Sequence, residues 1–277
     1  MAVTKTDQQD GIFTLTLDRP TSHNSLNAAV YAEILDAIQE AERDDRVRVI
    51  VTRSEGRSFS VGADAGNLDG YAGRGLRQTF DEDFSRKMGM HTGPCGALED
   101  LGVGRWVLAV ARVEKPWICA VQGVAAGGGF ALAMLHHFRI ASEKARFTAA
   151  FSKLGLGPEL GLSSTLPAIC GRQAAMDILL SSRMIEAEEA HRLGIVDRLV
   201  PHDDLEEKTL EFAGELARAA PLAVRAVLRS LSRRWLIELR EALEVEWRDQ
   251  AVLFSSQDFA EGVSAFAERR SPQFHGS

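Results

Sequence analysis

The feature that most constrains the fold is an apolar run, Trp117–Leu135, that glycines interrupt. Its first part, Trp117–Val121, is short and apolar and is bounded by Pro116 and Gly123, which is typical of a buried strand. Three consecutive glycines at 127, 128 and 129 follow, and then more apolar residues. This order predicts a buried strand that leads through a tight turn into a helix. Because the glycines break the run, it falls short of the roughly 20 apolar residues that span a bilayer.

Strand and helix patterns alternate through the first part of the chain. Alternating apolar residues predict a half-buried strand at 13–17, and an apolar stripe with a spacing of four predicts an amphipathic helix over 26–38. Asn24 or Ser25 could cap this helix. Further strands are expected at 47–51, 117–121 and 138–141. Strands joined by helices favour an α/β fold whose sheet has crossover connections.

The pattern becomes helical from about residue 203 onward. Pro201 and the following aspartates are typical of a helix start, and Leu239, Leu243 and Trp247 recur on one face of a later helix. We therefore expect a catalytic core over residues 1–200. Residues 201–277 would form a C-terminal helical segment that packs on the core or on a neighbouring subunit.

Composition and charge exclude several classes of protein. The 277 residues carry a formal net charge of −7, which argues against a nucleic-acid-binding surface. The three cysteines show no C-x-x-C or Cys/His spacing, so we expect reduced thiols and no metal site. The first residues lack the apolar centre of a signal peptide. The chain is therefore predicted to be cytoplasmic and not inserted in a membrane.

Two glycine-bearing turns are the first candidates for a functional site. One is Phe59–Asp64, and the other is Val121–Gly129, which leads into the predicted helix. Small residues let a ligand approach the backbone, and unused N–H groups at a helix N-terminus attract negative charge. The alternative is that these glycines only allow close packing. Either turn alone is a weak signal, whereas the pair is more specific.

Together with other segments, these turns resemble the crotonase superfamily, also called the enoyl-CoA hydratase/isomerase family. The resemblance covers about residues 11–276 and is weakest between 66 and 114. The matching segments are Asp18–Pro20, Asn24–Asn27, Phe59–Asp64, Lys115–Gly129, Ala145–Phe147, Ala150–Gly161, Leu166–Pro167, Gly171–Arg172, Ala187–Val200, Asp258–Val263, Phe266 and Arg269–Phe274.

The resemblance implies a fold and a way of binding substrate. The fold would be a spiral of ββα units with a C-terminal helical segment, assembled into trimers or pairs of trimers. The substrate would be an acyl-CoA thioester, with coenzyme A as part of the substrate and no tightly bound cofactor. The matched positions imply an oxyanion hole made by the N–H groups of Ala63 and Gly128. Such donors stabilise the negative oxygen of a thioester enolate.

The catalytic side chains implied by the resemblance favour one reaction over another. Hydratases of this family use two glutamates, whose positions here hold Ala131 and Phe151. The acidic residue of isomerase members matches Glu159. Apolar neighbours such as Leu156 and Leu160 would raise the pKa of Glu159 toward neutrality. The alternative for Glu159 is an ordinary exposed carboxylate in a turn.

Coenzyme A contacts are implied at two places in the chain. Arg19, Ser25 and Leu26 match the region that contacts the nucleotide in relatives, and Asp64 either joins them or orders its own turn. Phe266 and Arg270 could pack on the adenine or pair with a phosphate, from a neighbouring subunit. For the second pair, helix packing and surface charge are an equally good interpretation.

Together these observations predict an enoyl-CoA isomerase that uses a single glutamate. Three alternatives stay open: a thioester hydrolase or dehalogenase-like enzyme, a hydratase, and an acyl-CoA-binding protein without activity. A hydratase would need an acid from the long segment 66–114, where His91, Glu99 and Asp100 are candidates. That segment shows no clear periodicity, and loops of such length are often functional.

Overall fold

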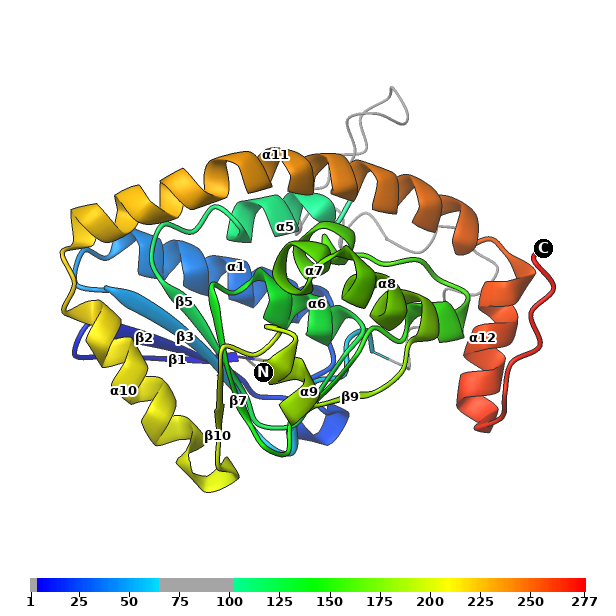
Figure 1. Cartoon of the computed structure of the whole chain (residues 1–277), viewed down its shortest axis with the longest axis horizontal. Helices are drawn as coiled ribbons and strands as arrows, with labels where there is room; N and C mark the ends of the chain where they lie inside the picture. Colours follow the sequence, from blue (N-terminus) through cyan, green and yellow to red (C-terminus); the bar gives the residue numbers. More distant parts are fainter. Residues whose placement is uncertain (1–3, 65–101) are drawn as a thin grey trace.

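The computed structural model describes residues 4–64 and 102–277, which form two sheets surrounded by helices (Figure 1). The six strands of the larger sheet lie in the order β1-β2-β3-β5-β7-β10. β1 runs antiparallel to β2, and the remaining neighbours are parallel. These strands are β1 (Thr4–Gln9), β2 (Ile12–Leu17), β3 (Val49–Ser54), β5 (Trp117–Val121), β7 (Phe138–Ser142) and β10 (Arg198–Val200).

Three of the four strands of the smaller sheet directly follow strands of the larger one, and the fourth, β9, follows α8. The order of the smaller sheet is β4-β6-β8-β9, with β4 (Ser58–Ser60), β6 (Val124–Ala126), β8 (Arg146–Thr148) and β9 (Ile185–Glu186). The chain passes from β3 to β4, from β5 to β6 and from β7 to β8, so each turn of the chain contributes one strand to each sheet. Helical segments follow the strand pairs β5–β6 and β7–β8. The predicted α/β spiral with C-terminal helices is thereby confirmed.

One group of helices forms the main apolar core together with the larger sheet. These helices are α1 (Ala28–Arg43), α5 (Gly104–Val110), α6 (Gly128–Leu135), α7 (Leu162–Cys170), α8 (Arg172–Ser181) and α9 (Ala187–Arg192). Every residue of α6 is buried, which explains why the run after the three glycines is apolar on all sides. Short 3₁₀ turns complete this part at η1 (Pro20–Ser22) and η2 (Phe151–Leu154).

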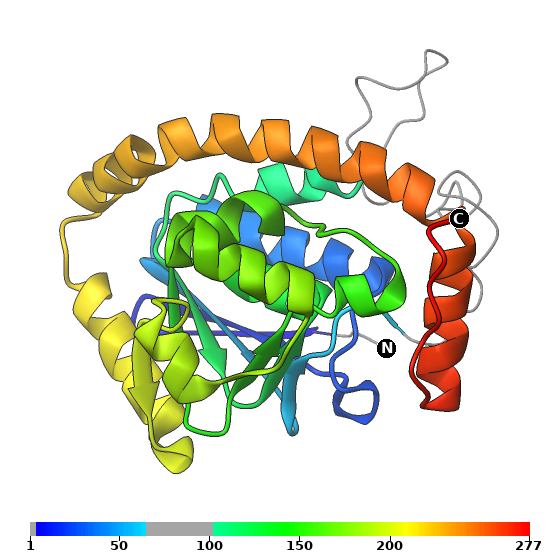
Figure 2. The same cartoon turned by 45° about the vertical axis from the view of Figure 1, so that its right-hand side comes forward.

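The C-terminal helices pack on elements that precede residue 200 in the same chain. After η3 (His202–Asp204), α10 (Leu205–Ala217) covers the outer face of the larger sheet, where Phe212 and Ala213 join a second apolar cluster. α11 (Pro221–Leu253) arches over α5 and α7, and α12 (Gln257–Glu268) lies against η2 (Figures 1 and 2). The proposed division at residue 200 stays a prediction. Within the described ranges, no helix combines the length and apolarity that crossing a membrane requires.

Two local expectations were wrong. The first long helix begins at Ala28 and not near Leu26, and Asn27 caps it by accepting a hydrogen bond from the Val30 N–H at 3.1 Å. Asn24 instead has a positive φ of 55° and uses its side chain elsewhere. In the segment without clear periodicity, residues 104–110 form the helix α5, because most of their side chains are buried against the core.

Candidate active site

The two glycine-bearing turns meet in space. A Cβ atom built on Gly62 would lie 2.8 Å from the backbone nitrogen of Gly128 and 2.7 Å from the carbonyl oxygen of Ala126. Gly62 also has φ +81°, a conformation that glycine adopts without strain. The turn after β4 therefore rests directly on the start of α6, and only glycine fits at this contact.

Neither candidate amide is used within the described part of the chain. Gly128 is the first residue of α6, so its N–H has no partner inside the helix. Ala63 forms a parallel bridge with Leu26 in which the Leu26 N–H donates to the Gly62 oxygen at 2.7 Å. Among the described residues, neither the Ala63 nor the Gly128 N–H donates a hydrogen bond. We call these two N–H groups the amide pair.

Buried polar contacts hold the turn of Ala63 in position. The Asn24 side chain donates to the oxygens of Glu55 and Ser58, both at 2.8 Å. Ser60 Oγ donates to the Asn24 oxygen at 2.8 Å and accepts from the Gly62 N–H at 3.2 Å. Asn24 and Ser60 thus tie the segment before α1 to the turn after β4.

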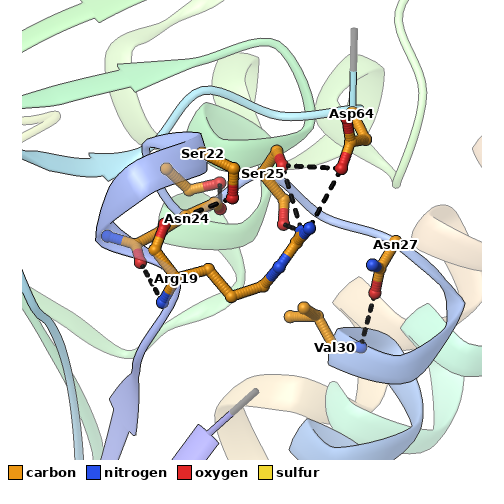
Figure 3. Close-up of polar contacts among 8 residues, drawn as sticks. Arg19, Ser22, Asn24, Ser25, Asn27, Val30 and Asp64 are labelled. Atoms are coloured by element: carbon orange, nitrogen blue, oxygen red, sulfur yellow. Dashed lines mark hydrogen bonds and ion pairs between the residues drawn. The ribbon is translucent and has the colours of Figure 1, made fainter. Parts of the chain in front are cut away.

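Arg19, Ser25 and Asp64 gather beside this turn, as Figure 3 shows. The Arg19 guanidinium donates to the backbone oxygen of Ser25 at 2.5 Å and to Asp64 Oδ2 at 3.0 Å. Ser25 Oγ donates to the same Asp64 oxygen at 3.1 Å. Since Asp64 directly follows Ala63, Arg19 also restrains the chain at the amide pair. Whether these residues contact coenzyme A stays a prediction.

Glu159 lies in the segment between η2 and α7, beside α6. Residues 157–163 are called the carboxylate loop below. The next residue, Leu160, is buried, and its Cδ1 lies 3.3 Å from a Cβ atom built on Gly128. Leu160 also has φ +58°, and such strained backbone is enriched at functional sites. The side chain of the residue after Glu159 thus lies beside the residue that supplies one member of the amide pair.

The surroundings of Glu159 change its acidity. Burial and the nearby carboxyl of Glu246 raise the pKa of Glu159 from 4.5 to about 7, and a hydrogen bond from Gln250 opposes this rise. A carboxyl with such a pKa exists in both forms near neutral pH. It can therefore accept a proton and return it.

Glu246 and Gln250 of α11 hold the carboxylate loop. Glu246 is buried and accepts hydrogen bonds from the Gly161 N–H at 2.8 Å and the Ser163 N–H at 2.9 Å. Gln250 is also buried and bonds to both the N–H and the oxygen of Gly157, and to Glu159 Oε2, each at 3.3 Å.

The sequence did contain a signal for these two residues, although the sequence interpretation missed them. Leu239, Leu243, Glu246 and Gln250 follow one another at spacings of four, three and four, which places them on one helix face. These four are the buried residues of α11. Two polar residues that continue an apolar stripe indicate buried polar contacts.

The two positions that the resemblance matches to the hydratase glutamates belong to the main apolar core. Ala131 is fully buried in α6, and Phe151 is buried at the start of η2. Neither side chain can transfer a proton. The Tyr31 hydroxyl lies 3.6 Å from a Cβ atom built on Gly128.

The candidate coenzyme A residues of the tail lie on or just after α12. Phe266 is 61% exposed, and the Arg270 guanidinium pairs with both oxygens of Glu261 and with Glu268. α12 packs closely on the chain just before the carboxylate loop, because a Cβ atom on Gly262 would lie 2.6 Å from the carbonyl carbon of Leu154. The roles of Phe266 and Arg270 stay predictions.

Other candidates lie elsewhere. His91, Glu99 and Asp100 fall outside the described residues. A cavity of about 930 Å³ lies between the outer face of the larger sheet and α10. None of the candidate residues within 4–64 and 102–277 lines it, so it is separate from the amide pair and the carboxylate loop.

Comparison with known proteins agrees with this geometry. The sequence model of the enoyl-CoA hydratase/isomerase family matches residues 7–90 and 98–277. The chain is 34% identical to the 1,2-epoxyphenylacetyl-CoA isomerase of Escherichia coli K12, over 97% of this chain and 96% of the relative. It is 36% identical to a probable enoyl-CoA hydratase of Rhizobium meliloti, over 97% and 96%.

Solved structures extend the likeness to the whole fold. An enoyl-CoA hydratase from Mycobacterium avium subsp. paratuberculosis K-10 superposes with a TM-score of 0.83 at 32% identity, covering 99% of both chains. An enoyl-CoA hydratase/isomerase from Pseudoalteromonas atlantica has a TM-score of 0.82 at 28% identity, covering 99% of this chain and all of the other. The chain belongs to the enoyl-CoA hydratase/isomerase family of acyl-CoA enzymes.

Proposed function

We propose that this enzyme moves a double bond in an unsaturated acyl-CoA, with Glu159 carrying the proton. The observation that carries the proposal is a carboxyl whose pKa is raised to about 7, next to a residue whose side chain lies beside Gly128. The unused amide pair supports it, because two N–H donors suit the oxygen of a thioester enolate.

The proposed reaction needs one proton and no added group. The Glu159 carboxylate takes a proton from the α-carbon of a 3-enoyl-CoA, and the electrons of that C–H bond move toward the thioester oxygen. The N–H groups of Ala63 and Gly128 hold the resulting dienolate. The Glu159 carboxylic acid then returns the proton two carbons further along the chain. The double bond lies at the 2-position afterwards, and Glu159 is ionised again.

Isomerisation is preferred to hydration because of Ala131 and Phe151. A hydratase of the usual kind would need acidic side chains at these two positions to activate water, and both are apolar and buried here. The name of the Escherichia coli relative, an isomerase, also supports the proposal. The name of the Rhizobium meliloti relative keeps hydration as the main alternative.

Substitution of Glu159→Gln tests the assignment. We expect turnover of a 3-enoyl-CoA to fall roughly 100-fold to 10,000-fold, since the amide cannot take up the proton. The dissociation constant for an acyl-CoA should change only a few-fold, because the shape of the side chain is kept. The exposed Glu188→Gln on α9 is the matched control and should behave as the wild type. Full turnover in the Glu159 variant contradicts the proposal.

The same substrate separates the alternatives. Free coenzyme A detected with a thiol reagent would identify a hydrolase, and incorporation of labelled oxygen from water would identify a hydratase. Tight acyl-CoA binding without turnover of any thioester would identify a binding protein.

We further propose that coenzyme A enters only as part of the substrate, without another tightly bound cofactor, and that the enzyme works in the cytoplasm as trimers or pairs of trimers. Assembly is supported by large apolar side chains that α11 leaves exposed, among them Leu222 (76%), Leu231 (72%) and Val252 (70%). Contact with another subunit would remove this surface from water. Sedimentation equilibrium gives the number of subunits.

A further inference from the structure

We infer that Glu246 and Gln250 are positioning residues for Glu159: Glu246 anchors the carboxylate loop and brings a second buried carboxyl close to Glu159, and Gln250 orients the Glu159 side chain. This inference rests on the proposed role of Glu159 as the proton carrier. Both residues lie on α11, more than eighty positions after the loop that they hold.

Glu246 anchors the loop by acting as the cap of α7. The N-cap residue of α7, Gly161, has no side chain of its own that could accept hydrogen bonds from the first turn. Glu246 Oε2 accepts from the Gly161 N–H at 2.8 Å, and Oε1 accepts from the Ser163 N–H at 2.9 Å and from Ser163 Oγ at 2.5 Å. Helix N-termini favour negative charge, so this arrangement supports the ionised form of Glu246.

The same contacts place a charge beside Glu159. Burial raises the pKa of Glu246, while its hydrogen bonds from Ser163 and Gly161 oppose the rise. Once Glu246 is ionised, its charge disfavours ionisation of Glu159, which adds to the effect of burial. Within the described ranges, Glu246 is the charged group that acts on the pKa of Glu159; η2, α7 and α12 add none.

Gln250 acts in the opposite direction. Its Nε2 donates to Glu159 Oε2, and a donor of this kind favours the ionised carboxylate. The same amide group bonds to the Gly157 N–H and oxygen at the start of the loop, so its orientation is fixed by the backbone. One turn of α11 thus carries one group that raises the pKa of Glu159 and one that lowers it.

Two variants with opposite expected effects test the inference. Glu246→Gln removes the charge and nearly keeps the shape, so the acid limb of the kcat/KM profile should move to lower pH. Gln250→Leu removes the donor, so the limb should move to higher pH. A displacement of one pH unit changes the rate at pH 5 relative to that at pH 9 roughly tenfold. The exposed Glu241→Gln on the same helix is the control and should leave the profile unchanged.

A second measurement follows Glu159 directly. In protein labelled with carbon-13 at the glutamate carboxyls, the Glu159 signal is identified by its loss in Glu159→Gln, and its titration midpoint is recorded in each variant. Midpoints that move in opposite directions support the inference. Midpoints that stay, or that move the same way, overturn it, because simple loosening of the loop would affect both variants alike. If Glu246→Gln does not fold, Gln250→Leu decides by itself.

The two ideas can fail separately. If the midpoints move as expected but the wild type isomerises no enoyl-CoA, the proposed function is wrong and the control of Glu159 by α11 stands. If the wild type isomerises its substrate and Glu159→Gln does not, but neither α11 variant moves the midpoint, the inference is wrong and the proposed function stands.

Discussion

The two halves of the candidate site are held by different means. The amide pair is positioned by backbone against backbone, where Gly62 and Gly129 allow two turns to touch. The carboxylate loop is positioned by side chains of α11, mainly Glu246 and Gln250. Asn24, Ser60 and Arg19 brace the turn of Ala63, but the contact between the two turns itself requires that no side chain lies there. The loop depends on the chemistry of particular side chains.

This difference shows which property of each half can be changed by substitution. A backbone donor presents the same N–H group whatever the side chain, so the amide pair offers a fixed way to stabilise negative charge. The acidity of a carboxyl depends on its neighbours, so the loop can be tuned by residues that never touch the substrate. Substitutions at the amide pair should change folding or lower the catalytic rate at every pH. Substitutions around the carboxylate loop should change how the catalytic rate depends on pH.

The largest expected effect is that of Gly129→Ala. A Cβ atom at this position would lie 2.2 Å from the backbone oxygen of Ser60, so β4 or α6 must move. We expect a loss of at least about 4 kcal/mol in the free energy of unfolding, or no folded protein. Gly157→Ala in the carboxylate loop is the matched control. Among the described residues its Cβ would meet only Leu253 Cδ1, at 3.4 Å, so a change within about 1 kcal/mol is expected.

Denaturant unfolding of the two variants measures this contrast. Equal losses in both would show that the two halves of the site are equally intolerant of side chains. The comparison between a backbone-held and a side-chain-held half would then be wrong.

A smaller effect, confined to catalysis, is expected from Gly128→Pro. Proline is well accommodated at the first position of a helix, and it lacks the N–H group. Gly128→Ala adds a similar Cβ atom, 3.3 Å from Leu160 Cδ1, and keeps the N–H group. We expect kcat to be about 100-fold to 1000-fold lower in the proline variant than in the alanine variant, which corresponds to about 3–4 kcal/mol. Thermal unfolding checks that both variants fold. Equal kcat values would exclude the Gly128 amide as a donor to the substrate.

Much of the fold could be predicted from the sequence, because local patterns determine it. The alternation at 13–17, the buried strand at 117–121 and the glycine turn before α6 all depend on residues close together in the chain. The cap of α1 was mispredicted, since Asn24, Ser25 and Asn27 are all suitable residues. Which of them caps the helix depends on distant contacts, here those of Asn24 with Glu55 and Ser58.

The residues proposed to act on the substrate could be predicted from the sequence, but the residues of α11 that hold the carboxylate loop could not. The glycine turns were found from their own small residues and Glu159 from its resemblance to a family motif, and their catalytic roles stay predictions. The contact of α11 with the carboxylate loop joins residues 161 and 246, which lie far apart in the sequence. The periodicity of apolar residues along a helix shows which face is buried, but not which loop packs against that face. The segment of α5 shows no clear periodicity in the sequence, yet it forms a helix because most of its side chains are buried.

The smallest expected effect is on the stability of Glu159→Gln, the variant that should lose activity. We expect this variant to be more stable than the wild type at high pH. In the folded protein the pKa of Glu159 is raised from 4.5 to about 7, so ionisation of this carboxyl disfavours folding. The penalty is absent below about pH 4.5, grows as the pH rises toward 7, and is complete above it. Glu159→Gln carries no such charge and keeps an oxygen that can accept from Gln250. We expect the variant to be about 3 kcal/mol more stable than the wild type at pH 8 and nearly equal to it at pH 4, as measured by urea unfolding. If the difference in unfolding free energy between variant and wild type does not depend on pH, Glu159 ionises as easily as a carboxyl in water. Glu159 would then not be a base whose pKa the carboxylate loop adjusts.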